Sequence, residues 1–368
     1  MRVAWVVPGG VDASGVERVI PALLWQIERL AARHDLHVFA LRQHDSACDY
    51  RLLGATVHAL APARAGSWRA VAGWASLERG LRVHGPFDVL HGFWAGLPGL
   101  YAGASGRLRR VPVVVTIGGG ELAARREIDY GGQIRWTSRA VVAASLRLAH
   151  RVTVATRVIG TQLTTKGYAA DLVPLGAPSD RFTPPPTAPA RPWRLLHIGS
   201  LNRVKDQRTL LAALAAIVRR EPEVTLDVVG EDTLGGEIQR QATALGLDGR
   251  VAFTGWQPSS ALAERYRRAH LLLVSSRHES GPLVALEAAL CGTPTVGTDV
   301  GHVADWAPGL ASAVPVGDAG ALADAALALL HDDDRRRAMA AAARTFALEH
   351  DADWTANRFD QIYRELVS

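Results

Sequence analysis

The sequence predicts an α/β protein built from two doubly wound parallel sheets. Three observations lead to this prediction. Short apolar runs alternate with helical patterns along the chain, the 368 residues are about twice the length of a typical domain, and a proline-rich segment interrupts the alternation near the middle. Continuous apolar runs of this kind are typical of strands that are buried on both faces of a parallel sheet.

The first half of the chain begins with the strand Val3–Val7, which ends at a Pro-Gly-Gly turn. A helix over about 15–33 is expected next. The strands expected after it are His37–Ala40, Val89–His91, Val113–Ile117 and Arg151–Ala155. This alternation predicts βαβ units with crossover helices.

The segment 183–192, TPPPTAPARP, marks the expected domain boundary. Half of its residues are proline, which fits neither a helix interior nor a central strand, so a stiff linker is expected. The predicted organisation is a first domain over 1–182, a second domain over 193–352, and a last helix over 353–368 that returns to the first domain.

The alternation restarts after the linker. The expected strands are Leu195–Ile198, Thr225–Val229, Val251–Phe253, Leu271–Val274 and Pro294–Val296. The expected helices begin near Asp206 and cover about 235–245, about 259–269 and Leu283–Cys291, and alanine-rich helices follow. Doubly wound sheets bind ligands at the carboxyl ends of their strands, so the loops that follow the strands are the candidate binding segments.

The composition favours a cytoplasmic protein without a disulfide framework. Cys48 and Cys291 are the two cysteines, and no Cys/His cluster has zinc spacing. The N-terminus does not resemble a signal peptide, and no apolar run approaches the roughly 18 residues of a membrane span. The net charge is +5, but the basic residues are scattered and form no nucleic-acid motif, so no nucleic-acid partner is expected.

Arginine is the usual cation of this chain. Of the 41 lysines and arginines only two are lysine, Lys166 and Lys205. A lysine retained against this bias indicates that its ammonium group is needed.

The segment 277–298, RHESGPLVALEAALCGTPTVGT, is mostly apolar and yet carries two glutamates, Glu279 and Glu287. Gly281 and Pro282 separate them. Proline suits the first position of a helix because its missing N–H costs nothing there. The pattern predicts a loop around Glu279 and a helix that starts at Pro282.

The start of this helix is a candidate anion site. The N–H groups of Leu283 and Val284 have no partner within the helix, and the helix dipole favours a negative ligand such as a diphosphate. Glu279 is expected beside this site. Glu287 is expected one turn into the helix, where its carboxylate can accept hydrogen bonds from sugar hydroxyls.

The pattern Glu-x7-Glu, with Ser-Gly-Pro after Glu279 and Glu-Ala-x-x-x-Gly-x-Pro from Glu287, resembles family 4 of the retaining nucleotide-sugar glycosyltransferases, which have the GT-B fold. The resemblance implies two Rossmann-like domains that face a central cleft, the first for the acceptor and the second for the nucleoside-diphosphate sugar. It also implies sugar transfer to a hydroxyl with retention, no cofactor beyond the donor and no essential metal. Glu279 would contact the transferred sugar and Glu287 the ribose.

The segment 195–214, LLHIGSLNRVKDQRTLLAAL, resembles the family's strand-Gly-loop-Lys segment, in which an arginine and a lysine hold the donor diphosphate. Lys205 matches the lysine. Ser200 stands at the arginine position, and Arg203 is a candidate replacement for the missing charge. Gly255 and Trp256 match the loop near the nucleobase, where Trp256 either stacks on the base or packs against the protein.

The first domain matches the family less well. Gly15 lies in the segment 8–19, which resembles the family's glycine-rich phosphate loop, although an ordinary βα turn remains the alternative. After the strand Val113–Ile117 the family commonly has a histidine, and here Gly118 to Gly120 and Glu121 follow instead. Glu121 is a candidate sugar or acceptor contact.

Candidate acceptor contacts also follow another strand of the first domain. His91 and Trp94 lie at the end of the strand Val89–His91, and packing is the alternative role for both. The basic amphipathic segment 133–152 suggests either a weak membrane-surface contact or a packed surface helix. The Asp-x-Asp patterns at 332–334 and 351–353 are interpreted as helix caps rather than metal ligands.

Two other classes of protein remain alternatives. A nucleotide-sugar epimerase would need acid and base groups over the sugar, for which Glu121, Glu279 and His91 are the candidates. A non-catalytic sugar-nucleotide binding protein would bind the donor without transfer or hydrolysis. For the glycosyltransferase, the acceptor classes left open are a glycan, a glycolipid and a natural product, and the oligomeric state is not predicted.

Overall fold

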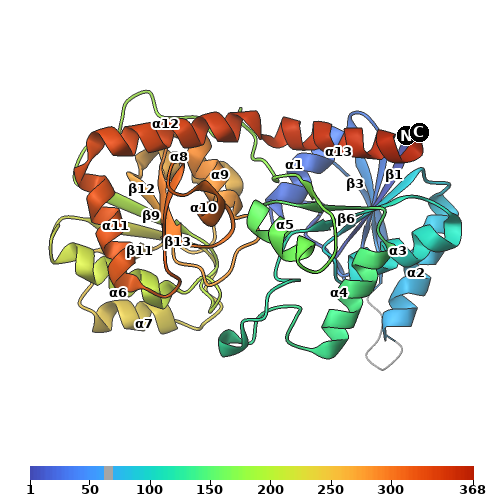
Figure 1. The fold of residues 1–368 in the computed structure, drawn as a ribbon, viewed down its shortest axis with the longest axis horizontal. Helices are drawn as coiled ribbons and strands as arrows, with labels where there is room; N and C mark the ends of the chain where they lie inside the picture. The colour runs from blue at the N-terminus through green and yellow to red at the C-terminus, as the bar shows by residue number, and fades with distance from the viewer. Residues whose placement is uncertain (62–68) are drawn as a thin grey trace. The chain divides into compact units, whose positions relative to one another are not determined.

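The structure is a computed structural model that describes residues 1–61 and 69–368 (Figure 1). The chain divides into two compact units. The first contains Met1–Leu175 together with Ala352–Ser368, and the second is Gly176–Asp351.

The proline-rich segment belongs to the second unit, so the boundary lies earlier than the sequence predicted. The backbone oxygen of Thr183 accepts a hydrogen bond from Arg267 at 2.9 Å, and that of Pro189 lies 3.1 Å from Nε2 of His270. The buried ring of Phe182 contacts the ring of Tyr266. Proline composition shows that a segment is stiff, but it does not show what the segment packs against.

Within the described residues, the first unit contains an eight-stranded sheet in the order β3-β4-β2-β1-β5-β6-β7-β8. The strands are β1 Arg2–Val7, β2 Asp35–Ala40, β3 Cys48–Leu52, β4 Ala55–Ala59, β5 Val89–Phe93, β6 Val113–Ile117, β7 Arg151–Val154 and β8 Asp171–Leu172. Among the strands of the described residues, β3 and β4 are the one pair that runs antiparallel. Their turn, Leu53-Gly54, has φ of 49° and 90°, which are the left-handed values that two-residue hairpins require.

The helices of the first unit are α1 Pro21–Ala31, α2 Arg69–His84, α3 Leu97–Arg109, α4 Trp136–Leu148, α5 Arg157–Thr164 and α13 Ala352–Val367, with a 3-10 turn at Arg126–Ile128. The first helix starts at Pro21 and not near residue 15 as predicted. The preceding loop is closed by a bridge between Val11 and Val19 and by a hydrogen bond from Ile20 N–H to Gly10 O at 2.8 Å. These tertiary contacts override the helical pattern of residues 15–20.

The C-terminal helix α13 packs against α1 and buries its apolar face in the first unit (Figure 1). The buried residues of that face include Ala356, Phe359, Ile362 and Tyr363. Tyr363 OH accepts a hydrogen bond from Trp5 Nε1 at 3.1 Å and lies 2.6 Å from Nδ1 of His91. The last helix is therefore part of the core of the first unit.

The second unit contains a six-stranded sheet in the order β11-β10-β9-β12-β13-β14, with every neighbouring pair parallel in the part of the chain described. The strands are β9 Arg194–Ile198, β10 Thr225–Val229, β11 Val251–Phe253, β12 Leu271–Val274, β13 Thr295–Thr298 and β14 Ala311–Val314. The helices are α6 Gln207–Val218, α7 Glu237–Ala244, α8 Ser259–Arg268, α9 Leu283–Leu290, α10 Gly301–Trp306, α11 Ala319–His331 and α12 Asp333–Glu349.

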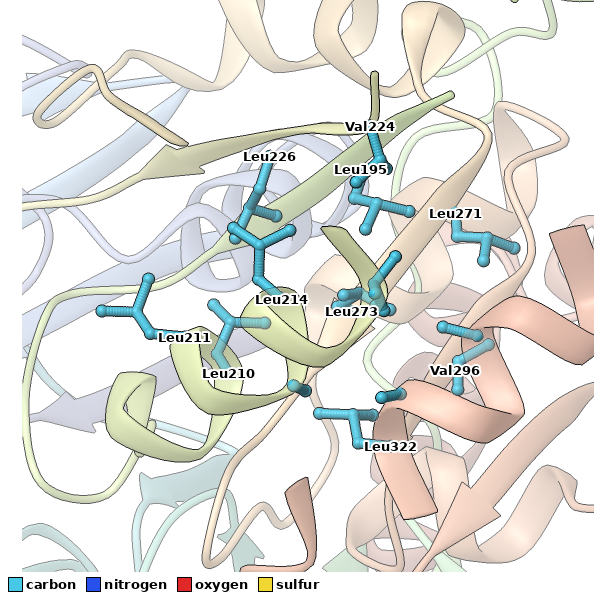
Figure 2. Close-up of a cluster of buried hydrophobic side chains, with 14 of the residues drawn as sticks. Leu195, Leu210, Leu211, Leu214, Val224, Leu226, Leu271, Leu273, Val296 and Leu322 are labelled. Carbon is cyan, nitrogen blue, oxygen red and sulfur yellow. The ribbon is translucent and has the colours of Figure 1, made fainter. Parts of the chain in front are cut away.

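Figure 2 shows how the apolar face of α6 meets this sheet. Leu210 and Leu214 of α6 lie beside Leu226 of β10 and Leu273 of β12, and all four side chains are buried. Each fully buried leucine contributes about 1.5–3 kcal/mol relative to exposure. This core fixes the strands β9 and β12, whose carboxyl ends carry the candidate site.

Candidate active site

The loops that follow β9 and β12 are hydrogen-bonded to each other. Because β9 and β12 are parallel neighbours, both loops leave the same edge of the sheet. The N–H of Arg277 donates to the carbonyl of Val204 at 2.7 Å, and Ser275 Oγ donates to the carbonyl of Lys205 at 2.7 Å. The two segments singled out in the sequence are thus brought together.

Lys205 and Glu279 form an ion pair across these loops. Lys205 Nζ lies 2.5 Å from Glu279 Oε1, and Ser276 Oγ donates to the same oxygen at 2.6 Å. The side chains are 25% and 13% exposed, so the pair is partly shielded but open to a ligand. Gly301, at φ +52°, lies against Glu279, and a Cβ there would come within 3.0 Å of Glu279 Cβ. The missing side chain at Gly301 therefore leaves room for Glu279.

Arg277 adds a second cation that the sequence reasoning missed. Its Nε lies 3.0 Å from Oδ2 of Asp206. Asp206 also caps α6, because its carboxylate accepts hydrogen bonds from Thr209 N–H at 3.4 Å and from Thr209 Oγ1 at 2.8 Å. The signal in the sequence that could have identified Arg277 was its position two residues before Glu279.

The helix α9 begins at Leu283, the predicted first residue of the segment Leu283–Cys291, and its role as an anion site stays a prediction. Pro282, which was expected at the first helical position, is instead the N-cap residue, with ψ of 113°. The N–H of Ala285 donates to the carbonyl of Pro282 at 3.1 Å, so the amides of Leu283 and Val284 precede the helix's own hydrogen bonds. Gly281, Leu283 and Val284 are each partly exposed.

Glu287 lies deeper in the protein than the sequence predicted. Its side chain is 3% exposed, and Oε2 accepts a hydrogen bond from Tyr266 OH of α8 at 2.6 Å. Burial raises the pKa of this carboxyl to about 7. Oε1 is the oxygen that a ribose hydroxyl would use, and that contact stays a prediction.

The other predicted donor residues of the second unit lie in loops after strands. The carbonyl of Ser200 accepts a hydrogen bond from Gln207 Nε2 at 3.1 Å. Arg203 is exposed, and its charge acts on Glu237 of α7, whose pKa is lowered first by the bonded Arg208 and more weakly by Arg203. The role of Arg203 as a replacement for an arginine at Ser200 stays a prediction.

Gly255 and Trp256 follow β11. Gly255 has φ +67°, and its carbonyl accepts a hydrogen bond from Gly230 N–H at 2.9 Å, which ties the loops after β10 and β11 together. The ring of Trp256 is 51% exposed, so its side chain is available to a ligand.

Gly15, in the first unit, has φ +65°, and its N–H donates a hydrogen bond to the carbonyl of Asp12 at 3.0 Å, as in a tight turn.

His91 is not an acceptor contact. The strand β5 continues to Phe93, so His91 lies inside the sheet with no exposed surface. Its Nδ1 is 2.6 Å from Tyr363 OH and its Nε2 is 2.7 Å from Thr116 Oγ1. Burial lowers the pKa of this imidazole to about 3, which keeps it neutral. The packing alternative is correct for this residue.

Glu121 organises the loop after β6. Its carboxylate accepts hydrogen bonds from the N–H groups of Ala95, Gly118 and Gly119 at 3.1, 3.3 and 2.7 Å. Burial raises the pKa of this carboxyl, while these hydrogen bonds oppose the shift. Trp94, at φ +73°, lies over the glycines, and a Cβ on Gly119 would come within 3.0 Å of the indole nitrogen. The glycine run thus admits Trp94.

Glu121 also borders a cavity of about 430 Å³ in the first unit. The cavity is lined by Gly96, Leu97, Glu121, Gly132, Thr137, Ser138, Val141 and Val142. In the second unit, a cavity of about 500 Å³ lies against Arg194 and Thr225, at the amino ends of β9 and β10. That end is opposite to the edge that carries Lys205 and Glu279.

The aspartates of the two Asp-x-Asp patterns have protein partners. Asp332 caps α12 by accepting a hydrogen bond from Arg335 N–H at 2.9 Å. Asp351 accepts one from Ser179 Oγ at 2.7 Å. Asp353 pairs with Arg29, whose Nε lies 2.9 Å from Oδ1.

Among the described helices, none has the length and apolar character needed to cross a membrane.

Solved structures share this architecture. Sucrose-phosphate synthase from Thermosynechococcus elongatus matches 100% of this chain and 99% of that chain with a TM-score of 0.82 and 22% identity. Anabaena HepE in complex with UDP-glucose matches 99% of this chain and 100% of that chain with a TM-score of 0.78 and 17% identity. The chain thus has the GT-B fold of glycosyltransferases.

Sequence comparison identifies the family. The family described as "Glycosyl transferase 4-like domain" matches residues 15–176, and "Glycosyl transferases group 1" matches residues 179–346. The chain belongs to family 4 of the GT-B glycosyltransferases, which confirms the resemblance inferred from the two glutamates.

Curated relatives are D-inositol 3-phosphate glycosyltransferases. That of Corynebacterium jeikeium is 35% identical over 225 residues, which cover 54% of this chain and 52% of the relative. That of Segniliparus rotundus is 38% identical over 154 residues, or 37% of this chain and 34% of the relative. The chain therefore spans about half or less of the length of these relatives.

Proposed function

We propose that this chain is a retaining glycosyltransferase that moves a sugar from a nucleoside-diphosphate sugar to a hydroxyl acceptor. The observation that carries the proposal is the ion pair between Lys205 and Glu279, which joins the loops after β9 and β12. The amide groups at the start of α9 follow Glu279 in the same loop. A cation, a carboxylate and free amides at one sheet edge suit a sugar attached to a diphosphate.

In the proposed reaction, the bond between the anomeric carbon and the diphosphate oxygen breaks, and the acceptor oxygen bonds to the same face of that carbon. The acceptor proton passes to the departing diphosphate. Lys205 and the amides of Leu283 and Val284 stabilise the charge that develops on the diphosphate. Glu279 orients the transferred sugar, and Glu287 the ribose. We propose that these groups supply the charge stabilisation without an essential metal.

Uridine is the first candidate for the donor base. The support is indirect, because the fold is shared with HepE, whose structures contain UDP and UDP-glucose. The exposed ring of Trp256, directly after β11, is the candidate surface for stacking on the base.

The cavity beside Glu121 is the candidate acceptor site. The hydroxyl groups of Thr137 and Ser138 border it together with the apolar side chains of Val141 and Val142. A ligand with hydroxyl groups and an apolar face fits this lining, as a glycan, a glycolipid or a natural product would. The named activity of the relatives makes an inositol phosphate the first acceptor to test.

The test is thermal unfolding with UDP, GDP, ADP, TDP and their sugar conjugates, without metal. A bound ligand raises the midpoint according to the ratio of its concentration to its dissociation constant. We expect one base to give a clear shift in the wild type and in Lys166→Ala, which removes the other lysine of the chain, and a reduced shift in Lys205→Ala. Donor turnover with an acceptor should fall about 10²–10³-fold in Lys205→Ala.

The alternatives predict other outcomes of the same assays. Isomerised donor without an acceptor would indicate an epimerase. Donor binding without transfer or slow hydrolysis would indicate a sugar-nucleotide binding protein. No shift with any nucleotide in a folded sample would contradict the proposed donor site.

A further inference from the structure

Three histidines of the first unit form a cluster that the sequence did not predict. His37 lies on β2, His58 on β4 and His84 at the end of α2. One ring nitrogen from each lies within 4.8 Å of the other two, and this is the one such group of potential metal ligands within residues 1–61 and 69–368. The three residues come from separate elements, so their spacing in the sequence matches no zinc motif.

The hydrogen bonds around two of these rings define where a cation would bind. His58 Nδ1 lies 2.9 Å from Asp49 Oδ1, and His37 Nε2 lies 3.3 Å from Asp35 Oδ1. Carboxylates accept hydrogen bonds, so Asp49 holds the proton of His58 on Nδ1, and Asp35 favours the same arrangement at Nε2 of His37. The inner nitrogens, His37 Nδ1 and His58 Nε2, are 2.9 Å apart. With both protons outside, these two lone pairs face each other and repel unless a cation lies between them.

Arg2 is the group that favours a different arrangement. Its Nη2 lies 3.4 Å from His37 Nε2 and could donate to it. In that case His37 would carry its proton on Nδ1 and donate to His58, with no cation present. Metal binding therefore requires Asp35 rather than Arg2 to set the tautomer of His37.

We propose that His37, His58 and His84 bind one Zn²⁺ ion. Three imidazoles with an open fourth position are a known zinc ligand set, and the outer Asp–His hydrogen bonds are the contacts that orient such ligands. Zn–N bonds of about 2.1 Å place tetrahedral ligand nitrogens roughly 3.4 Å apart. The inner nitrogens of His37 and His58 must separate slightly. The ring of His84, which stacks on that of His58 with centroids 4.0 Å apart, must turn so that one of its nitrogens points at the ion.

Aromatic side chains shield the proposed site. The ring of Phe39 stacks on His58 at 4.7 Å, and Phe87 meets His37 edge-on at 5.3 Å, which limits access of water. The ion would join two strands and the end of α2, and its binding free energy would add to the stability of the fold. It has no role in the proposed transfer.

The test is a Zn²⁺ titration of the chelator-treated and dialysed full chain against a chromophoric chelator, with Co²⁺ as a spectroscopic probe. We expect one Zn²⁺ per chain, a tetrahedral Co²⁺ spectrum and a midpoint of unfolding that rises with Zn²⁺. His84→Gln, at a half-buried helix end, should lose at least about 100-fold in affinity. His331→Gln, which changes an exposed histidine of the second unit, should bind as the wild type does.

Asp35→Ala, which removes the acceptor, tests the tautomer argument at an exposed position that should not affect folding. We expect its Zn²⁺ affinity to fall about 10-fold, the effect of losing an outer partner of a ligand. Zn²⁺ binding that is equal in the wild type and in His84→Gln would overturn the proposal, as would a wild type that binds no Zn²⁺ at micromolar concentration.

Discussion

At the scale of single residues, the ionisation of Glu287 makes the stability of the protein depend on pH. Burial raises the pKa of this carboxyl from 4.5 to about 7. Between these pH values the folded protein holds a proton that the unfolded chain releases. The free energy of unfolding should therefore fall as pH rises from about 4.5 to about 7, by up to about 3 kcal/mol, and level off above that.

Glu287→Gln should remove this dependence, because the amide does not ionise and can still accept the hydrogen bond from Tyr266. The measurement is denaturant unfolding of the wild type and the variant from pH 5 to pH 8. The variant should gain stability relative to the wild type across that range. Glu231→Gln, on an exposed glutamate, is the control. Parallel profiles for wild type and Glu287→Gln would show that the carboxyl ionises as an ordinary surface acid.

The candidate site was predictable where a residue lies beside the end of an apolar strand. Lys205 and Glu279 follow strands with clear apolar patterns, and the structure brings them together. His91 was wrongly placed because β5 extends two residues past the expected end, and a strand end cannot be located to that precision from composition. The partner of Glu287, Tyr266 on α8, depends on helix packing that the sequence does not reveal.

At the scale of elements, one tyrosine connects α13 to the sheet of the first unit. Trp5 Nε1 can only donate, so the hydroxyl of Tyr363 accepts from Trp5 and donates to His91 Nδ1. His91 then carries its proton on Nε2 and donates to Thr116. In this buried chain of hydrogen bonds, the donor or acceptor role of each group is set by its neighbour.

Tyr363→Phe should therefore destabilise the protein by roughly 2–4 kcal/mol, because two buried polar groups lose their partner without a change in packing. Equilibrium unfolding monitored by tryptophan fluorescence measures this loss. Tyr168→Phe, at a half-buried tyrosine of the same unit, should stay within about 0.5 kcal/mol of the wild type. An equal effect of the two substitutions would argue against the hydrogen-bonded chain.

The elements themselves were predictable to different degrees. Thr225–Val229 and Val251–Phe253 form strands with the expected bounds because tightly spaced apolar residues define them. The antiparallel strand β3 was missed, since Cys48–Leu52 is largely exposed and carries polar residues where alternation is needed. The start of α1 was misplaced because a bridge in the preceding loop competes with the helix.

At the scale of the whole molecule, the two units differ in how the chain builds them. The second unit is continuous from Gly176 to Asp351, whereas the first needs Ala352–Ser368 in addition to Met1–Leu175. The buried side chains of α13 include Phe359, Ile362 and Tyr363. At about 1.5–3 kcal/mol each, their burial is comparable to the net stability of a domain, about 5–15 kcal/mol.

The fragment 176–351 should accordingly fold alone, unfold cooperatively and retain the nucleotide binding of the full chain, whereas 1–175 should not fold. A permuted fragment, in which 352–368 precedes 1–175 through a flexible linker, should recover cooperative unfolding because it restores α13 to the core. Circular dichroism and thermal unfolding of the three fragments measure this difference. A fragment 1–175 that melts like the permuted one would mean that α13 covers the first unit without being needed for its fold.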